Sequence, residues 1–261
     1  MPQSITPLDK KKHAALTFKA LEDYSFTKNM LSMPLLAFEV AEAANCFPIV
    51  FAPGSAATPH ALLGLGEKNI FVDAKGRWLA SYIPLVAANY PFSLISAPTP
   101  EQPAPPADTQ ETPPSEVFLA IEEDAPHFHK KDGQPLYTPE GEATELLHRI
   151  SSAMGNQHQR FKESKKALAE LALSGVLAER SITVHSGGAA RMVSGLRVAD
   201  REKVMALPDP TLARWTKNGV LEILFAHWRS MHKLQNLLED PSCPAADSSK
   251  DGGADTTPPV Q

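Results

Sequence analysis

The sequence has little cysteine and no long apolar run. Cys46 and Cys243 are its two cysteines among 261 residues, and neither a disulfide framework nor a metal-binding motif can be built from them. We therefore expect two free thiols in a reducing compartment. No stretch approaches the roughly 18 consecutive apolar residues that a membrane-spanning helix needs. The sequence therefore predicts no transmembrane segment.

The N-terminal region lacks the apolar segment of a secretory signal peptide, although it carries the positive charges of Lys10, Lys11 and Lys12. The default expectation is a cytoplasmic protein, and signal-independent export to the cell surface stays open. The net charge is -5 and the isoelectric point is near 6.0, so no overall positive field favours nucleic acid. We expect no nucleic-acid partner.

Complete catalytic and nucleotide-binding motifs are also missing. Gly64 and Gly66 begin a G-x-G pattern, but Asn69 stands where the third glycine of a dinucleotide-binding loop belongs. The sequence contains no phosphate-binding P-loop and no G-x-S-x-G elbow. The lack of a catalytic set favours a non-enzymatic function over an enzymatic one, and no cofactor is expected.

His127 and His129 are the nearest approach to a metal-binding set, with Asp124 and Asp132 close by. An H-x-H pair can donate two ligands from one loop or strand edge. No third ligand follows at a recognisable spacing. We therefore predict an exposed polar loop and no metal site.

The segment from residue 61 to residue 92 carries the densest local signals. Residues 70–72 are β-branched or aromatic, and they lead into Asp-Ala-Lys-Gly at 73–76, a combination typical of a tight turn. A short helix is expected at 84–90. Pro84 suits the first turn of a helix, and Pro91 cannot continue one. Strand-like residues follow it.

Two longer helices are predicted in the second half. Thr138 is a candidate N-cap with a proline directly after it, and this helix is expected to run to about Leu173. A narrow stripe repeats along it at steps of three and four. The stripe consists of Leu147, Ile150, Met154, Gln157, Phe161, Ser164, Leu168 and Leu171. It fits either a helix packed on the protein's own sheet or a helix pair between subunits. Residues 220–239 predict a more apolar helix.

Short strands dominate the first half and helices the second, which predicts an α+β fold. We expect a mixed or antiparallel sheet in the first half, covered by the long amphipathic helix and the apolar C-terminal helix. Residues 1–240 are predicted to form a single domain. The proline-rich residues 97–115 are predicted to be a disordered insert, and residues 241–261 a disordered tail. Two domains joined near Pro135 are the alternative.

Several motifs together resemble one protein family. Within residues 61–92 the elements ALLGL, NIFVD, GRW, YIP and YPF occur in this order. The similarity extends to FPIVF at 47–51, EGEATELL at 140–147, LRVAD at 196–200 and AHWRSMHKLQNL at 226–237. These motifs resemble the bacterial SapC family over about His13 to Leu238. The resemblance implies an association with a bacterial surface layer, and it brings no catalytic residues with it.

Two functional hypotheses follow. The first is a non-enzymatic binding or assembly protein linked to the bacterial cell surface layer, with a protein partner or self-association through the helical face. The second is an enzyme or small-ligand-binding protein whose site lies where the GRW turn meets the last helix. Its candidate ligand-binding residues are Arg77, Trp78, Tyr82, His227 and Ser230. Core packing is the competing interpretation of Trp78 and His227.

Overall fold

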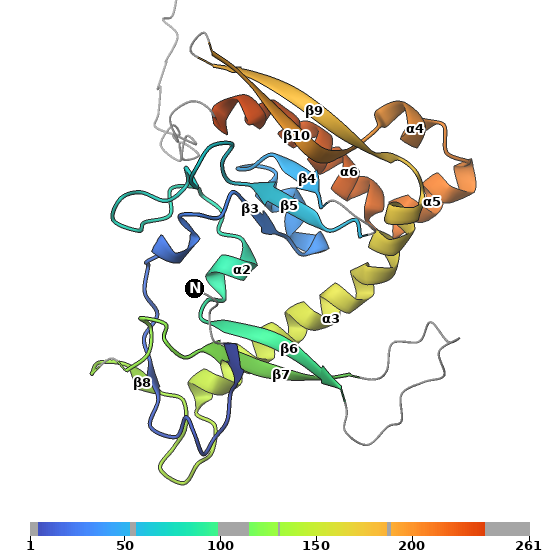
Figure 1. Cartoon of the computed structure of the whole chain (residues 1–261). Coiled ribbons are helices and arrows are strands. Elements are labelled where there is room, and N and C mark those ends of the chain that lie inside the picture. Colours follow the sequence, from blue (N-terminus) through green and yellow to red (C-terminus); the bar gives the residue numbers. More distant parts are fainter. Residues whose placement is uncertain (1–4, 53–55, 99–114, 130, 187–188, 238–261) are drawn as a thin grey trace, which may run out of the picture.

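The computed structural model describes residues 5–52, 56–98, 115–129, 131–186 and 189–237. Within these residues the chain forms antiparallel sheets and six α-helices, which confirms the predicted α+β fold (Figure 1). Most of the predicted insert and tail lies outside the described residues, so the predicted domain boundaries stay a prediction. In the described part of the chain, no helix has the length and apolar character needed to cross a membrane.

The larger sheet has five strands in the order β3-β5-β4-β10-β9. They are β3 (Ser32–Pro34), β5 (Pro59–Leu62), β4 (Ile49–Phe51), β10 (Ala189–Ala199) and β9 (Leu177–Ser186). Neighbouring strands are antiparallel, and Arg197 opposite Phe51 joins the early strands to the β9–β10 hairpin. The hairpin from the second half of the sequence therefore completes the sheet that the first half begins.

A smaller antiparallel sheet has the order β1-β7-β6. It consists of β1 (Ile5–Pro7), β7 (Ser115–Glu122) and β6 (Phe92–Pro98), while β2 (Thr17–Phe18) and β8 (Gln134–Pro135) form a separate pair. Phe92 and Leu94 of β6 lie opposite Ile121 and Leu119 of β7. Because side chains alternate along a strand, these four apolar side chains share one face of the sheet, and they belong to one hydrophobic core.

The long helix α3 (Glu145–Leu173) runs from the smaller sheet to the larger one (Figure 1). It begins after Thr144, whose Oγ1 accepts a hydrogen bond from the Leu147 N–H. The predicted N-cap at Thr138 is wrong, because residues 138–141 form a turn in which the Gly141 N–H donates to the Thr138 carbonyl. Gly141 has a φ of 83°, which a helix excludes.

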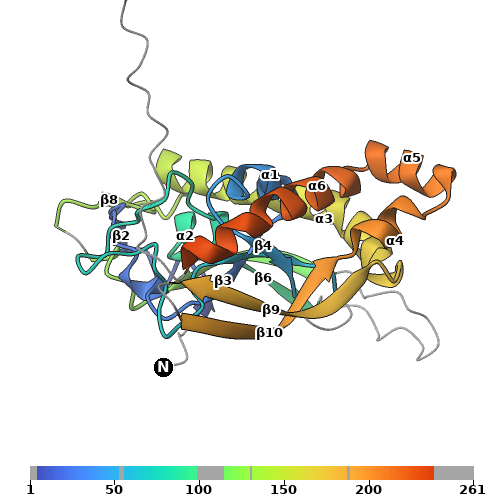
Figure 2. The same cartoon turned by 90° about the horizontal axis from the view of Figure 1, so that it is seen from above.

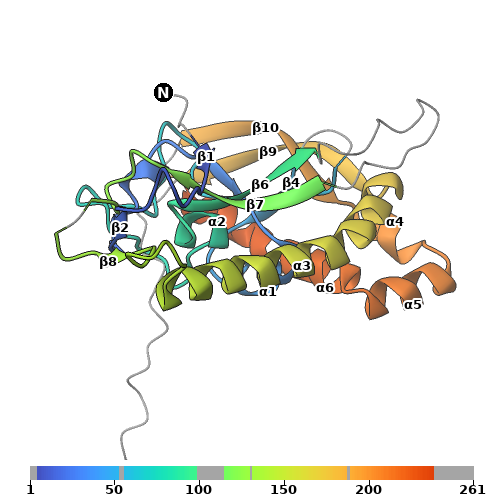
Figure 3. The same cartoon turned by 90° about the horizontal axis from the view of Figure 1, so that it is seen from below.

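The remaining helices are shorter. They are α1 (Val40–Ala43), α2 (Leu85–Ala88), α4 (Arg201–Met205), α5 (Asp209–Lys217) and α6 (Val220–Ser230), with 3-10 helices at Ser25–Thr27, Ala37–Glu39 and Met231–Leu237. The predicted C-terminal helix is thus α6 continued by a 3-10 segment. Helices α1, α3, α5 and α6 lie on one side of the strands, as the two turned views agree (Figures 2 and 3).

Two hydrophobic cores lie at the two ends of α3. The larger core joins buried residues of β4, β5, α1 and α6, and the smaller core joins buried residues of β6, β7 and the segments around β2 and β8. Helix α3 contributes Leu147 and Met154 to the smaller core and Leu168 and Leu171 to the larger one. The helix therefore connects the two cores, and the residues between these pairs span the distance from one to the other.

Candidate functional site

Trp78 and Tyr82, two of the predicted site residues, lie together beside the larger core. The Trp78 Nε1–H donates to the Tyr82 carbonyl oxygen at 2.8 Å, and the rings of Tyr24 and Phe47 contact the indole edge to face. The Tyr82 hydroxyl donates to Oε1 of Glu39 at 2.8 Å. The Trp78 Nε1–H and the Tyr82 hydroxyl are thus both hydrogen-bonded within the protein.

Glu39 explains why Tyr82 is held so firmly. Its side chain is only 2% exposed, and its carboxylate also accepts hydrogen bonds from the backbone N–H groups of Leu36 and Leu85 at 2.8 Å each. Burial and the hydrogen bond to this carboxylate raise the pKa of Tyr82 well above its ordinary value. The carboxylate connects the start of α2 to the segment that precedes α1.

Arg77 points away from both cores and is exposed. Its Nε–H donates to Oδ2 of Asp73 at 2.8 Å, and its backbone N–H donates to Oδ1 at 2.9 Å. These two bonds, the backbone one first, hold the pKa of Asp73 below its ordinary value. The turn predicted at 73–76 is present, with Gly76 at a φ of 84°.

His227 and Ser230 lie buried at the junction of α6 with two strands of the larger sheet. Nδ1 of His227 donates to the Ile49 carbonyl at 2.6 Å, and Nε2 accepts from the Ala199 N–H at 3.1 Å. Oγ of Ser230 accepts from the Ile49 N–H at 2.9 Å and donates to the His227 carbonyl at 2.7 Å. Burial lowers the pKa of His227 to about 4, so the ring is neutral at physiological pH.

The predicted residues therefore form separate hydrogen-bonded groups: Trp78 with Tyr82, His227 with Ser230, and Arg77 on an exposed turn. The structure gives each of them a role in holding the fold. Their role as a ligand site stays a prediction.

The histidine pair at 127 and 129 is not an exposed loop throughout. His129 is exposed, but His127 is buried and packs against the rings of Phe18 and Tyr90, because its ring fills part of the smaller core. In the ranges that the structure describes, no group of three or more His, Cys, Asp or Glu side chains is arranged to hold a metal ion.

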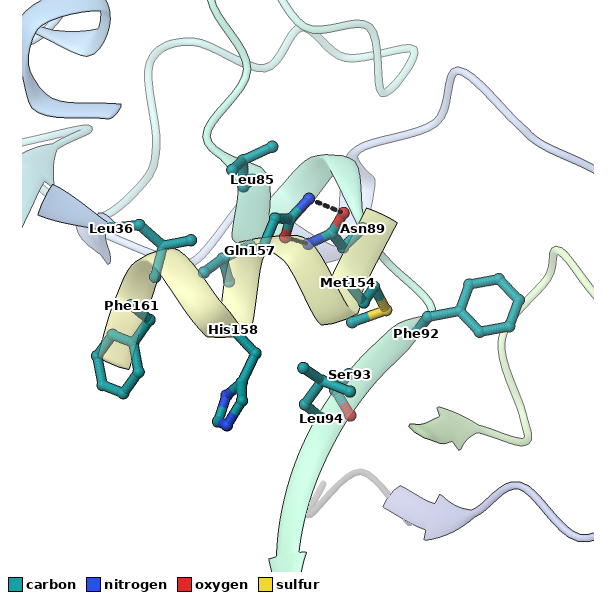
Figure 4. A pocket seen from close by; sticks show the side chains of 11 residues that line it. Leu36, Leu85, Asn89, Phe92, Ser93, Leu94, Met154, Gln157, His158 and Phe161 are labelled. Carbon is teal, nitrogen blue, oxygen red and sulfur yellow. Dashed lines mark hydrogen bonds between the residues drawn. The ribbon is translucent and has the colours of Figure 1, made fainter. Parts of the chain in front are cut away.

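A groove of about 310 Å³ lies between α2, β6 and α3, and we call it the α3 groove (Figure 4). Its lining residues are Leu36, Leu85, Val86, Asn89, Phe92, Ser93, Leu94, Met154, Gln157, His158 and Phe161. Seven of these eleven side chains are apolar. Three separate parts of the sequence meet here, and pockets of this size and composition are typical of binding sites.

Four polar side chains interrupt the apolar lining. Asn89 Nδ2 donates to Gln157 Oε1 at 2.7 Å, and Gln157 Nε2 donates back to Asn89 Oδ1 at 3.4 Å, as the dashed lines in Figure 4 show. Oγ of Ser93 and Nε2 of His158 are shielded from solvent and have no hydrogen-bond partner among the described residues. Burial, with a smaller effect of the Lys162 charge, lowers the pKa of His158. Buried polar atoms without partners are uncommon and mark this groove.

The groove exists because the stripe along α3 is covered only at its two ends. Met154 and Leu168 are buried in the two cores, whereas Gln157 and Ser164 are half-buried and Phe161 is 38% exposed. The sequence carries the signal for this gap, since the two polar residues of the predicted stripe stand in its middle. On the neighbouring flank of α3, the Arg160 guanidinium lies 3.5 Å above the Phe38 ring.

Strand β6 gives the groove a polar backbone edge. The Glu122 N–H donates to the Pro91 carbonyl, so Phe92 and Ile121 face each other as a non-hydrogen-bonded pair. Alternation along the ladder then directs the N–H and C=O of Leu94 away from β7. Because β6 is the outer strand in the sheet order, that edge pairs with no strand in the described ranges.

Of the groove residues, the sequence singled out only Met154, Gln157 and Phe161, which belong to the stripe on α3. Ser93 lies in an ordinary strand pattern, and Asn89 lies at the end of a predicted helix, so neither is unusual in its local context. His158 stands next to the stripe, where a histidine on an amphipathic helix carries no special signal.

Comparison with known proteins gives one match. The family model described as SapC matches residues 8–237, which are most of the chain. No curated protein and no solved structure matches the chain. The match covers the described elements from β2 to the last 3-10 helix, including every residue of the α3 groove. The chain belongs to the SapC family.

Proposed function

We propose that this protein is a non-enzymatic binding protein that takes part in the assembly of a bacterial surface layer. The observation that carries the proposal is the uncovered middle of the α3 stripe, which opens into an apolar groove. A protein partner, or a second copy of the chain, would cover this part of the helical face. The link to the surface layer is what membership of the SapC family suggests.

The rim of the α3 groove has the chemistry of a docking surface. Val86 and Phe161 are 48% and 38% exposed, and large apolar side chains that meet at a groove mark interaction sites. Lys162, Lys165 and Lys166 lie exposed on the same helix. A partner segment with apolar anchors and neighbouring acidic side chains fits both features.

The backbone edge of β6 adds a second means of recognition. An extended partner segment can add to an open edge and form backbone hydrogen bonds, here with the outward N–H and C=O of Leu94. Its side chains would then reach the apolar lining of the groove. This arrangement requires no catalytic group.

Site-specific photo-cross-linking in the native cells tests the proposal. A benzophenone amino acid replaces Val86 at the groove rim, and in a control protein it replaces Met205 on α4, which has a similar exposure of 54%. We expect a product of defined mass from position 86 and none from position 205. Identical products from both positions, or no product from either, would contradict a docking role for the groove.

The same product tests the link to the surface layer. After cell fractionation, the product from position 86 should be recovered with the cell envelope, and its second component should be a surface-layer protein or another copy of this chain. Recovery of the product only from the soluble fraction would contradict the envelope link while leaving the docking role supported.

A further inference from the structure

The α3 groove combines an apolar body with unpartnered polar atoms on two facing walls. In Figure 4, Met154 and His158 project from α3 on the side of the helix that faces β6, the strand that carries Ser93 and Leu94. Nε2 of His158 and Oγ of Ser93 have no hydrogen-bond partner among the described residues. A buried polar atom without a partner costs free energy, so a ligand that supplies a partner is favoured over an empty groove.

The charges around the groove indicate the sign of that ligand. None of the α2 and β6 residues that line it is charged, and His158 is the one titratable residue of the lining. Lys162 lies one helical turn further along α3, and its charge acts on His158. With a cation beside the histidine and no carboxylate in the lining, an anionic group fits and a cationic group is repelled.

We propose that the α3 groove binds a free aliphatic carboxylic acid, with its chain against Leu85, Leu94 and Met154 and its carboxylate hydrogen-bonded to His158 beside Lys162. A volume of about 310 Å³ is at the small end for ligand sites, which favours a medium-length chain over a long one. The carboxylate supplies the acceptor that the His158 ring lacks.

This inference goes beyond the proposed function and does not depend on it, because binding of a free acid is measured on the purified protein without a partner. Failure of octanoate to bind would leave the cross-linking result at position 86 unaffected. Failure of the cross-link would equally leave octanoate binding unaffected.

Isothermal titration calorimetry with three probes of equal chain length tests the inference. We expect octanoate to bind the full chain at least roughly tenfold more tightly than 1-octanol or octylamine, since only the acid gains a charge-assisted hydrogen bond. Chemical-shift changes in nuclear magnetic resonance spectra should include the His158 ring and the Leu94 amide. Equal affinity for the three probes, shift changes confined to other regions, or no binding at millimolar octanoate would overturn the proposal.

Two lysines on one helix provide a matched control. Lys162→Gln should weaken octanoate binding several-fold, because Lys162 lies one helical turn from His158. Lys166→Gln removes the same charge one turn further along α3 and should leave the affinity unchanged. Both side chains are exposed, so neither variant disturbs a core. Equal effects of the two substitutions would show a general charge effect and overturn the site.

The pH dependence of octanoate affinity distinguishes a histidine that contacts the ligand from one that has only a structural role. A bound carboxylate favours protonated His158, so octanoate affinity should increase as pH falls from about 7.5 to 6, where the probe itself stays ionised. His158→Gln should bind octanoate more weakly and should lack this increase. An increase of equal size in the variant would overturn the role of His158.

Discussion

His227 shows how a single side chain can join three elements. Nδ1 donates to β4 at Ile49, and Nε2 accepts from the end of β10 at Ala199, while the residue itself belongs to α6. A second proton on the ring would sit on Nε2 and place two donors, Nε2–H and the Ala199 N–H, against each other. It would also add a buried charge. Both effects oppose protonation, in agreement with the lowering of the His227 pKa to about 4.

Acidification from pH 7 to pH 5 is expected to lower the free energy of unfolding by about 2 kcal/mol through His227. The unfolded ring takes up a proton near its ordinary pKa of 6.5, whereas the folded ring does so only near a pKa of about 4. Between these values the unfolded state binds more protons, so stability is lost as pH falls. Urea denaturation at several pH values measures the effect.

His227→Gln provides the control, because glutamine retains a donor and an acceptor. The variant should be less stable at pH 7 and should lose this part of the pH dependence. His60 and His158, whose pKa values are also lowered by burial, remain in both proteins and cancel in the comparison. A variant with the same slope as the parent protein would contradict the assignment.

Residue by residue, the sequence identifies turns better than sites. Asp73 and Gly76 predict their turn because the conformations of Asp and Gly are local properties. The polar atoms of Ser93 and His158 become unusual only when β6 and α3 meet, which no local pattern encodes. Of the candidate site, the sequence therefore indicates only Gln157, a polar member of an otherwise apolar stripe.

Among the elements, α3 has a middle section that depends on helix propensity more than on packing. Gly155 lies in this section, and a Cβ added there would meet no atom within 4 Å. A glycine inside a helix costs about 1 kcal/mol relative to alanine. The uncovered part of α3 thus contains an avoidable weak point.

Gly155→Ala is expected to stabilise the protein by about 1 kcal/mol, or to raise Tm by about 2–4 °C, because alanine loses less backbone entropy in a helix. Thermal unfolding followed by circular dichroism measures the change. Gly76→Ala is the matched control: its Cβ would lie 2.1 Å from Oδ1 of Asp23, at a φ of 84°, and the substitution should destabilise. A lower Tm for the Gly155 variant would show that the middle of α3 is constrained by contacts.

The elements themselves could largely be predicted from periodicity and turn residues. The helix expected at 84–90 contains α2, the strand-like residues expected after it form β6, and the apolar helix expected at 220–239 begins with α6. The boundary error at α3 arose because Thr138 and Thr144 both satisfy the pattern of an N-cap, and a turn with a left-handed Gly141 decides between them. Which strands pair could not be predicted, since pairing depends on contacts distant in sequence.

At the scale of the whole molecule, α3 is the element that both cores share. Leu147 is buried in the smaller core and Leu171 in the larger one, on a single helix of 29 residues. Unfolding of one core can destabilise the other core through α3 only if the uncovered middle of the helix stays helical. Cooperativity between the cores is therefore a property that can be measured, and it decides whether the two cores unfold as one unit or as two.

We expect Leu147→Ala and Leu171→Ala each to cost about 3 kcal/mol and to lower one common unfolding transition, because each removes packing from a core that α3 shares. Hydrogen exchange measured by mass spectrometry should show equal loss of protection in β4, within the larger core, and in β7, within the smaller one. Loss confined to β7 in the Leu147 variant and to β4 in the Leu171 variant would show two independently unfolding domains. In that case the α3 groove would lie on a linker helix, and a partner bound there would stabilise one domain against the other.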